Sequence, residues 1–164
     1  MTRLIAIIAA GLSLFASAAS AQQATSQETI TIAENYLAAY STFKPEKMAP
    51  FLAEDMVFSD PTSTDQTADG GAFMFNGKDA VLKGLGDYAA QYKAFSVNYD
   101  IERQYESNGV VVFVAQLTYN LVTNDDKTFT GAAPIVTAIT VENGKVVKHL
   151  DLYDYKGNVQ SFTD

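Results

Sequence analysis

The second half of the chain, from Phe95 onward, alternates between apolar and polar residues, and this pattern constrains the fold more than any other feature of the sequence. Phe95, Val97, Tyr99 and Ile101 would share one face of a strand, because successive side chains on a strand point to opposite faces. Three more apolar stretches follow, separated by the turn sequences SNG, TNDDKT and ENGK. An Asn-Gly pair between two such stretches is typical of a tight hairpin. The pattern therefore predicts four long strands joined as an antiparallel meander.

The first half of the chain predicts helices. Apolar residues recur at every third or fourth position over residues 28–43, which is the spacing of one helix face. Thr25 followed by Glu28 forms a capping-box pattern for the start of this helix. Pro45 should end it, because the residue before a proline avoids the helical conformation. The same proline suits the first turn of a short second helix, and a third helix is predicted over residues 76–95.

A short strand, DMVFSDP, is predicted between the second and third helices and places Met56 and Phe58 on one face. The polar, turn-rich residues 62–75 that follow it are predicted to form a loop. Helices come before most of the strands, which is the pattern of an α+β fold. No internal repeat or second domain is visible, so we expect one α+β domain.

The first 21 residues have the layout of a secretory signal peptide. One arginine precedes a short apolar run, and small residues lead to Ala21, after which cleavage is expected. Gly11 and Ser13 interrupt the run, whereas a membrane anchor needs about 20 uninterrupted apolar residues. A lipid anchor would need a cysteine at the cleavage point, and the chain has none. We therefore expect residues 1–21 to be removed and a single domain, residues 22–164, to be periplasmic or secreted without a membrane anchor.

The charge and residue content exclude several classes of function. The net charge of −8 repels phosphate backbones, so no nucleic-acid partner is expected. The absence of cysteine excludes disulfides, zinc–thiolate sites and a thiol nucleophile. The single histidine falls short of the three protein ligands that a catalytic zinc normally takes. We therefore expect neither a metal nor a cofactor.

The succession of two helices, a strand ending in Asp-Pro, a helix after NGKDAV and a meander closing with GKVVKHLDLYDY resembles the NTF2-like superfamily. Within it, the sequence is most similar to ketosteroid isomerases and SnoaL-like polyketide cyclases, over essentially the whole of residues 22–164. The resemblance implies a cone in which a curved, mostly antiparallel sheet wraps around the N-terminal helices and encloses an apolar pocket. It also implies a homodimer through the convex face of the sheet. Proteins of this fold include isomerases, cyclases, hydrolases, dehydratases and plain binding modules.

The resemblance also suggests site residues. Tyr36 and Asp60 occupy the positions of the isomerase's oxyanion donor and proton-moving carboxylate. Thr137 falls where the isomerase has a second oxyanion donor, a protonated acid, so the chain departs from the isomerase pattern there. His149 and Asp151 replace apolar cavity residues of the isomerase, and SnoaL-like cyclases similarly place His and Asp inside.

Two readings of the last strand remain open. His149, Asp151 and Tyr153 share one face, and Leu150 and Leu152 share the other. On a sheet with one wet face, the leucines would form the core and the histidine would be solvated. If the leucines instead lie in a dimer interface, the histidine faces the cavity, and we favour this arrangement.

Asp60 and Tyr36 also have structural alternatives. A carboxylate at a cavity wall loses hydration, which raises its pKa toward the range of a general base, but Asp before Pro also commonly starts a turn. Tyr36 could equally be an ordinary aromatic of a helix face whose hydroxyl reaches water.

The sequence supports two hypotheses for the function. The first is an exported isomerase, cyclase or hydrolase without a cofactor, acting by proton transfer on a small apolar carbonyl compound. Asp60 or Asp151 would be the base and His149 its proton partner, with Tyr36 and Thr137 as oxyanion donors and Tyr153 and Phe58 in contact with substrate. The second is a non-catalytic module that binds a hydrophobic small molecule or serves in an assembly.

Overall fold

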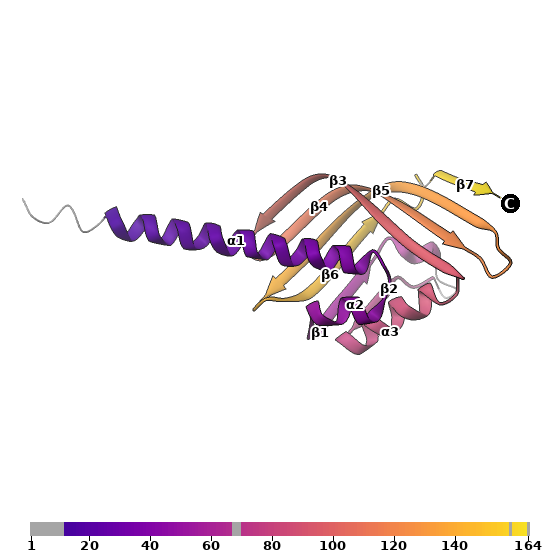
Figure 1. Cartoon of the computed structure of the whole chain (residues 1–164), viewed down its shortest axis with the longest axis horizontal. Coiled ribbons are helices and arrows are strands. Elements are labelled where there is room, and N and C mark those ends of the chain that lie inside the picture. The colour runs from indigo at the N-terminus through magenta and orange to yellow at the C-terminus, as the bar shows by residue number, and fades with distance from the viewer. Residues whose placement is uncertain (1–11, 67–69, 158, 164) are drawn as a thin grey trace, which may run out of the picture.

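The computed structural model describes residues 12–66, 70–157 and 159–163. Most of the predicted signal peptide, residues 1–11, lies outside this part of the chain, and its cleavage stays a prediction. Figure 1 shows a long N-terminal helix whose first part extends beyond the sheet, and a strongly curved sheet over the remaining helices.

Three α-helices form, and the first differs from the prediction at its start. α1 covers Leu12–Tyr40, so it begins well before the predicted cap at Thr25. Residues 12–44 contain no glycine or proline that would interrupt a helix, so the helix can continue on the N-terminal side of Thr25. α1 stops before Pro45 as predicted. α2 is a single turn, Pro45–Met48, continued by the 3-10 turn Ala49–Phe51, and α3 covers Lys78–Ala89.

The strands form one sheet with the order β2-β1-β6-β5-β4-β3, and β7 pairs with the part of β5 that β6 leaves free. Among the strands that the structure describes, β1 and β6 pair in parallel and the other pairings are antiparallel. The strands are β1 (Leu52–Asp60), β2 (Phe73–Asn76), β3 (Ala94–Ser107), β4 (Val110–Val122), β5 (Thr128–Glu142), β6 (Lys145–Tyr153) and β7 (Val159–Thr163). The meander predicted from the alternating pattern is therefore confirmed.

Two hairpin turns explain the register of the meander. Asn108 and Gly109 have φ values of 50° and 85°, and Asn143 and Gly144 have 50° and 74°. Two consecutive residues with positive φ are what a type I′ turn requires, and its twist matches the twist of paired strands. Two other strands, β2 and β7, were not predicted. β2 lies in the segment expected to be a loop, where only four residues pair with β1.

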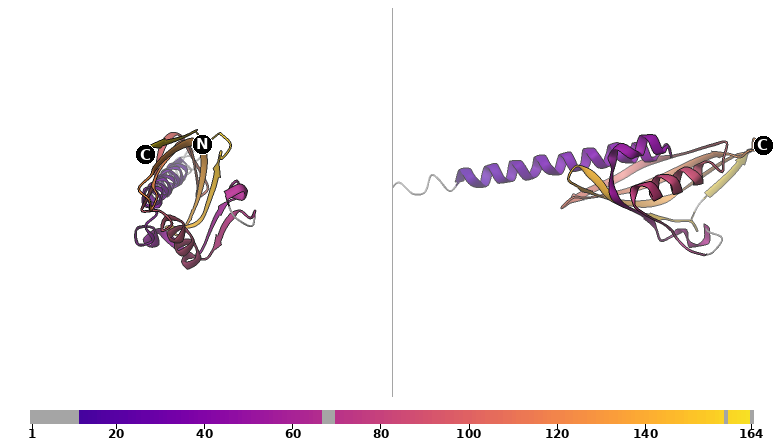
Figure 2. Two further views of the ribbon diagram at one scale, coloured as in Figure 1. Left: turned by 90° about the vertical axis from the view of Figure 1, so that its right-hand side faces the viewer. Right: turned by 90° about the horizontal axis from the view of Figure 1, so that it is seen from below.

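The helices cover the concave face of the sheet. α1 runs along the inside of the curve and α3 packs against β1 and β2 (Figure 2). The main hydrophobic cluster joins α1 to the sheet through Tyr36, Met48, Met56, Phe113 and Ile139, each fully buried. The α+β cone expected from the resemblance is thus the observed fold.

Candidate functional site

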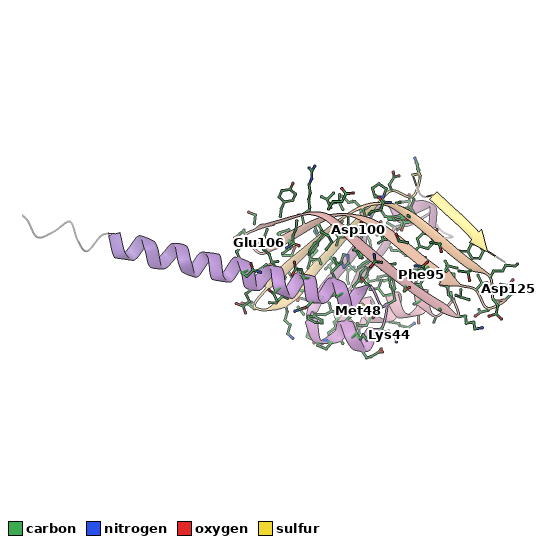
Figure 3. The ribbon with its side chains drawn as sticks, turned by 45° about the horizontal axis from the view of Figure 1, so that its top comes forward. Lys44, Met48, Phe95, Asp100, Glu106 and Asp125 are labelled. Carbon is green, nitrogen blue, oxygen red and sulfur yellow. The ribbon has the colours of Figure 1, made fainter. Side chains whose placement is uncertain are left out.

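A pocket of about 420 Å³ lies on the concave side of the sheet, between the strands and α3. Figure 3 labels Phe95, which lines the pocket from the start of β3 and contacts Tyr88 of α3, with 5.3 Å between ring centroids. The wall consists of aromatic and aliphatic side chains and two carboxylates, Asp60 and Asp151. The pocket is therefore an apolar site with two acidic groups.

Asp60 is the last residue of β1 and is only 5% exposed. One carboxylate oxygen, Oδ1, accepts hydrogen bonds from the Thr62 amide (3.0 Å) and the Thr62 hydroxyl (2.6 Å). The other, Oδ2, accepts one from the Tyr155 hydroxyl (2.7 Å). Burial raises the pKa of Asp60, and the hydrogen bonds from Thr62 and Tyr155 offset part of that rise. Asp60 therefore starts a turn and also stands on the pocket wall, and its role as a general base stays a prediction.

Asp151 is held more tightly than Asp60. Its Oδ1 accepts a hydrogen bond from the Thr137 hydroxyl (2.5 Å), and its Oδ2 accepts one from the Tyr40 hydroxyl (3.1 Å). Nε2 of His149 lies 2.9 Å from Oδ1. This nitrogen meets no hydrogen-bond criterion, so the contact is a close electrostatic one and not an aligned hydrogen bond. Three side chains thus fix the Asp151 carboxylate at the wall.

His149 is fully buried behind this carboxylate. The Tyr36 hydroxyl lies 2.9 Å from its Nδ1. The rings of Tyr36, Tyr40 and Phe58 surround the imidazole with centroid distances of 5.6, 4.5 and 4.9 Å. When Nδ1 accepts a hydrogen bond from the Tyr36 hydroxyl, the ring proton is on Nε2, on the side of Asp151.

The two helix tyrosines remain protonated donors. Burial, followed by the charge of Asp151, raises the pKa of Tyr36 and of Tyr40 well above the usual value. Tyr36, His149, Asp151 and Tyr40 thus form a hydrogen-bonded and electrostatic chain from the core to the pocket wall.

The structure separates the predicted site residues into two groups. Asp60, Asp151, Tyr153 and Phe58 line the pocket. Tyr36, His149 and Thr137 are fully buried and are not among the lining residues, so the expectation that they meet the substrate directly is corrected. Tyr40 and Asp151, which line the pocket, contact Tyr36, His149 and Thr137 from the pocket side.

The orientation of β6, which the sequence predicts as the last strand, is also determined. His149, Asp151 and Tyr153 are buried on the concave side, whereas Leu152 is 41% exposed on the convex side. The imidazole is therefore not solvated, and the leucines do not form the core.

Three polar residues of the site escaped the sequence analysis. Tyr40 lies one helical turn after Tyr36, and this i, i+4 spacing was a usable signal. Tyr155 follows the end of β6 and Thr62 follows β1, so the turns that bring them to Asp60 could not be read from a strand pattern. Their roles depend on tertiary contacts.

We expect Asp60→Asn to change the pH dependence of stability. The pKa of Asp60 is raised above its ordinary value of 3.8 in the folded protein, so the folded state binds this proton more tightly than the unfolded state. The contribution of Asp60 to stability therefore falls as the pH rises between the ordinary and the raised pKa. The variant removes this loss, so its stability relative to wild type should increase as the pH rises through that window, in urea unfolding followed by circular dichroism.

Asp55→Asn is the matched control, because Asp55 lies on the same strand and is exposed. A stability difference between Asp60→Asn and wild type that does not change with pH would contradict the burial of an ionisable Asp60.

Within residues 12–66, 70–157 and 159–163, no group of three or more His, Cys, Asp or Glu side chains is arranged to hold a metal ion. None of the helices in this part of the chain is long and apolar enough to cross a membrane.

Comparisons with known proteins identify the family. The sequence matches the SnoaL-like domain over residues 33–149, and no curated protein matches it. Among solved structures, a candidate SnoaL-like polyketide cyclase from Shewanella putrefaciens CN-32 is 19% identical with a TM-score of 0.67, over 96% of this chain and 94% of that one. A candidate cyclase of the same kind from Shewanella denitrificans OS-217 is 18% identical with a TM-score of 0.65, over 79% and 92%.

An NTF2-like protein from Anabaena variabilis ATCC 29413 is 13% identical with a TM-score of 0.62, over 80% of this chain and 93% of that one. At these identities the structural likeness concerns the fold. The family match covers well over half of the chain, so the protein belongs to the SnoaL-like family, within the NTF2-like fold.

Proposed function

We propose that the protein is an exported enzyme that binds a small, largely apolar carbonyl compound in the concave pocket and moves a proton on it without a cofactor. One observation carries this proposal. Two buried carboxylates, Asp60 and Asp151, stand on the wall of one apolar pocket, and burial raises the pKa of Asp60 toward the range in which a carboxylate works as a general base.

The contacts suggest separate roles for the two acids. Asp60 accepts hydrogen bonds from Thr62 and Tyr155, and we assign it as the base that takes a proton next to the carbonyl. Asp151 accepts hydrogen bonds from Thr137 and Tyr40 and lies against His149. We assign it as a fixed negative group whose position these side chains maintain.

The oxyanion donor is reassigned relative to the resemblance. The Thr137 hydroxyl donates to Asp151 and the Tyr36 hydroxyl contacts His149, so neither is free for a substrate oxygen. The Tyr153 hydroxyl is buried without a hydrogen-bond partner among the described residues, and Tyr153 lines the pocket. Burial raises the pKa of Tyr153, so this phenol keeps its proton and can donate a hydrogen bond to a developing oxyanion.

Native mass spectrometry of the freshly purified protein tests the proposal. We expect a retained small molecule, which wild-type protein slowly converts and the Asp60→Asn variant holds unchanged. A ligand that both proteins hold without conversion would favour the second function, a non-catalytic binding module. If no small molecule is detected, either on the native protein or after denaturation, the result would contradict both functions.

Export is part of the proposal. It rests on the layout of residues 1–21, and a bacterial host that secretes the protein should yield a chain beginning at Gln22 by intact-mass measurement. Full-length chain retained in the cytoplasm would contradict it.

We further propose a homodimer through the convex face of the sheet. Leu152 pairs across the strands with Val136, and Val136 pairs with Val114, so apolar side chains form a continuous row there. Tyr105 on β3 adds an aromatic ring that is 57% exposed. A contiguous row of exposed apolar side chains is a feature of interfaces between subunits.

Leu152→Glu should convert the dimer to a monomer, because a charge at the centre of an apolar interface loses its hydration. The measurement is molar mass by light scattering after size exclusion. Ile101→Glu is the matched control, since Ile101 is equally exposed, at 41%, but lies on the concave side of β3. A wild-type protein that is monomeric at all concentrations would refute the interface.

A further inference from the structure

The charged groups of the pocket wall are all acidic. Among the described residues that line it, the ionisable ones are Asp60, Asp151 and tyrosines, and none is Lys, Arg or His. Burial raises the pKa of pocket tyrosines such as Tyr88, Tyr153 and Tyr155, so these phenols stay neutral. The net charge of the chain is also negative, at −8. An anionic ligand would therefore meet repulsion both on approach and inside the pocket.

The hydrogen bonds that the Asp151 carboxylate accepts come from hydroxyl groups. Thr137 and Tyr40 donate hydrogen bonds from neutral hydroxyls. The nearest basic side chain, His149, lies behind this carboxylate, with Nε2 2.9 Å from Oδ1, and it is not among the residues that line the pocket. The described salt bridges that involve lysine are formed by exposed carboxylates elsewhere on the surface. A buried carboxylate is usually paired with a cation, and no side chain of the described pocket wall supplies one.

The aromatic side chains of the pocket stand at large angles to one another. Tyr88 and Phe95 make an interplanar angle of 89°, Phe43 and Phe95 also 89°, and Tyr153 and Tyr155 76°. These rings belong to a largely aromatic lining that also includes Tyr40, Phe58 and Phe73. The face of an aromatic ring attracts cations, and the attraction is strongest where water is excluded.

A third observation points to a ligand at the same place. The Tyr153 hydroxyl is buried without a partner among the described residues, and the side chain is only 8% exposed. A buried hydroxyl without a partner is costly. A polar atom of a ligand in the pocket would supply the missing hydrogen bond.

From the two carboxylates, the aromatic walls and the Tyr153 hydroxyl, which has no partner among the described residues, we propose that the ligand is an organic cation: an apolar body that carries an ammonium group and a polar oxygen. The ammonium group pairs with Asp151 and the ring faces, and the oxygen contacts Tyr153. This inference deepens the proposed function and rests on the same pocket, since it leaves Asp60 free to act as the base.

A series of probes that differ in charge but little in shape tests the inference. Benzyltrimethylammonium is the cation, neopentylbenzene is the neutral compound in which carbon replaces its nitrogen, and para-tert-butylbenzoate is the anion. We expect the full-length protein to bind the cation at least about tenfold more tightly than the neutral compound, by ligand-observed NMR. The anion should bind most weakly. Equal binding of cation and neutral compound, tighter binding of the anion, or no binding of any probe would overturn the inference.

Two variants test whether Asp151 is responsible for the preference for the cation. Asp151→Asn should remove most of the preference for the cation, whereas Asp100→Asn should keep it, because Asp100 is exposed on β3 and does not line the pocket. If the Asp151→Asn variant does not fold, the comparison of the three probes on wild-type protein still tests whether the pocket prefers a cation. If the protein binds the neutral probe as tightly as the cation but still catalyses proton exchange through Asp60, the preference for a cationic ligand is refuted and the proposed catalysis is not. If the protein prefers the cation but catalyses no proton exchange, the proposed catalysis is refuted and the preference for a cationic ligand is not.

Discussion

Replacement of Asp151 by alanine should lower the free energy of unfolding by several kcal/mol, because it leaves several buried polar groups without a partner. The reason lies in the partners that the carboxylate leaves behind. The hydroxyls of Thr137 and Tyr40 donate to it, and Nε2 of His149 lies 2.9 Å away. Thr137 and His149 are fully buried and Tyr40 is 5% exposed. Each loses its partner at a place that water reaches poorly, and each such group costs about 1–3 kcal/mol.

Urea unfolding of wild type, Asp151→Ala and Asp151→Asn measures this effect. The asparagine variant keeps an acceptor oxygen for one of the two hydroxyls, so it should lose clearly less stability than the alanine variant. Asp100→Ala is the control for removing an acidic side chain from an exposed strand position. If the Asp151→Ala and Asp100→Ala variants were equally stable, Asp151 would not hold the network together.

Much of the fold follows from local patterns in the sequence. Alternation of apolar and polar residues predicts β3 to β6, and the Asn-Gly turns at residues 108–109 and 143–144 fix their antiparallel pairing. Periodicity fails for β2, whose four residues are too few to display a pattern. The parallel pairing of β1 with β6 joins segments about 90 residues apart in the sequence, and no local signal reports such a contact.

The site was also predictable in part, because the alternation along a strand shows which residues share a face. His149, Asp151 and Tyr153 share a face because they are two residues apart on one strand, and the structure buries all three. Which of them reaches the pocket depends on side chains from other elements. Tyr40 from α1 and Phe58 from β1 pack around the imidazole, so His149 is enclosed while Asp151 stays at the wall. Alternation along a strand gives the side of a residue but not its depth.

Asp60→Asn should reduce catalysed proton exchange by about 10²- to 10⁴-fold, which is the usual contribution of a general base. An amide can accept the hydrogen bonds of Thr62 but cannot take a proton from carbon. The structure predicts that the fold tolerates this change, because Asn and Asp have the same shape and the pKa of Asp60 is already raised by burial. The Asp60→Asn variant should therefore lose activity while its stability near neutral pH is kept.

Proton exchange can be measured before the natural substrate is identified. Enolisable ketones that fit a pocket of about 420 Å³, such as cyclohexanone and β-tetralone with and without an ammonium substituent, are incubated with protein in deuterated water. NMR then reports the loss of the hydrogens next to the carbonyl. Asp55→Asn serves as the control on the same strand, and it should exchange these hydrogens at the wild-type rate.

The proposed catalysis requires that a buried carboxylate, Asp60, takes a proton from a molecule held in the concave pocket. The most direct measurement is the rate of deuterium uptake by the ketone panel with wild type, Asp60→Asn and Asp55→Asn side by side. We predict uptake above the buffer rate for wild type and Asp55→Asn, and a fall toward the buffer rate for Asp60→Asn. Uptake by wild type that Asp60→Asn leaves unchanged, or no uptake above the buffer rate with any ketone of the panel, would contradict it.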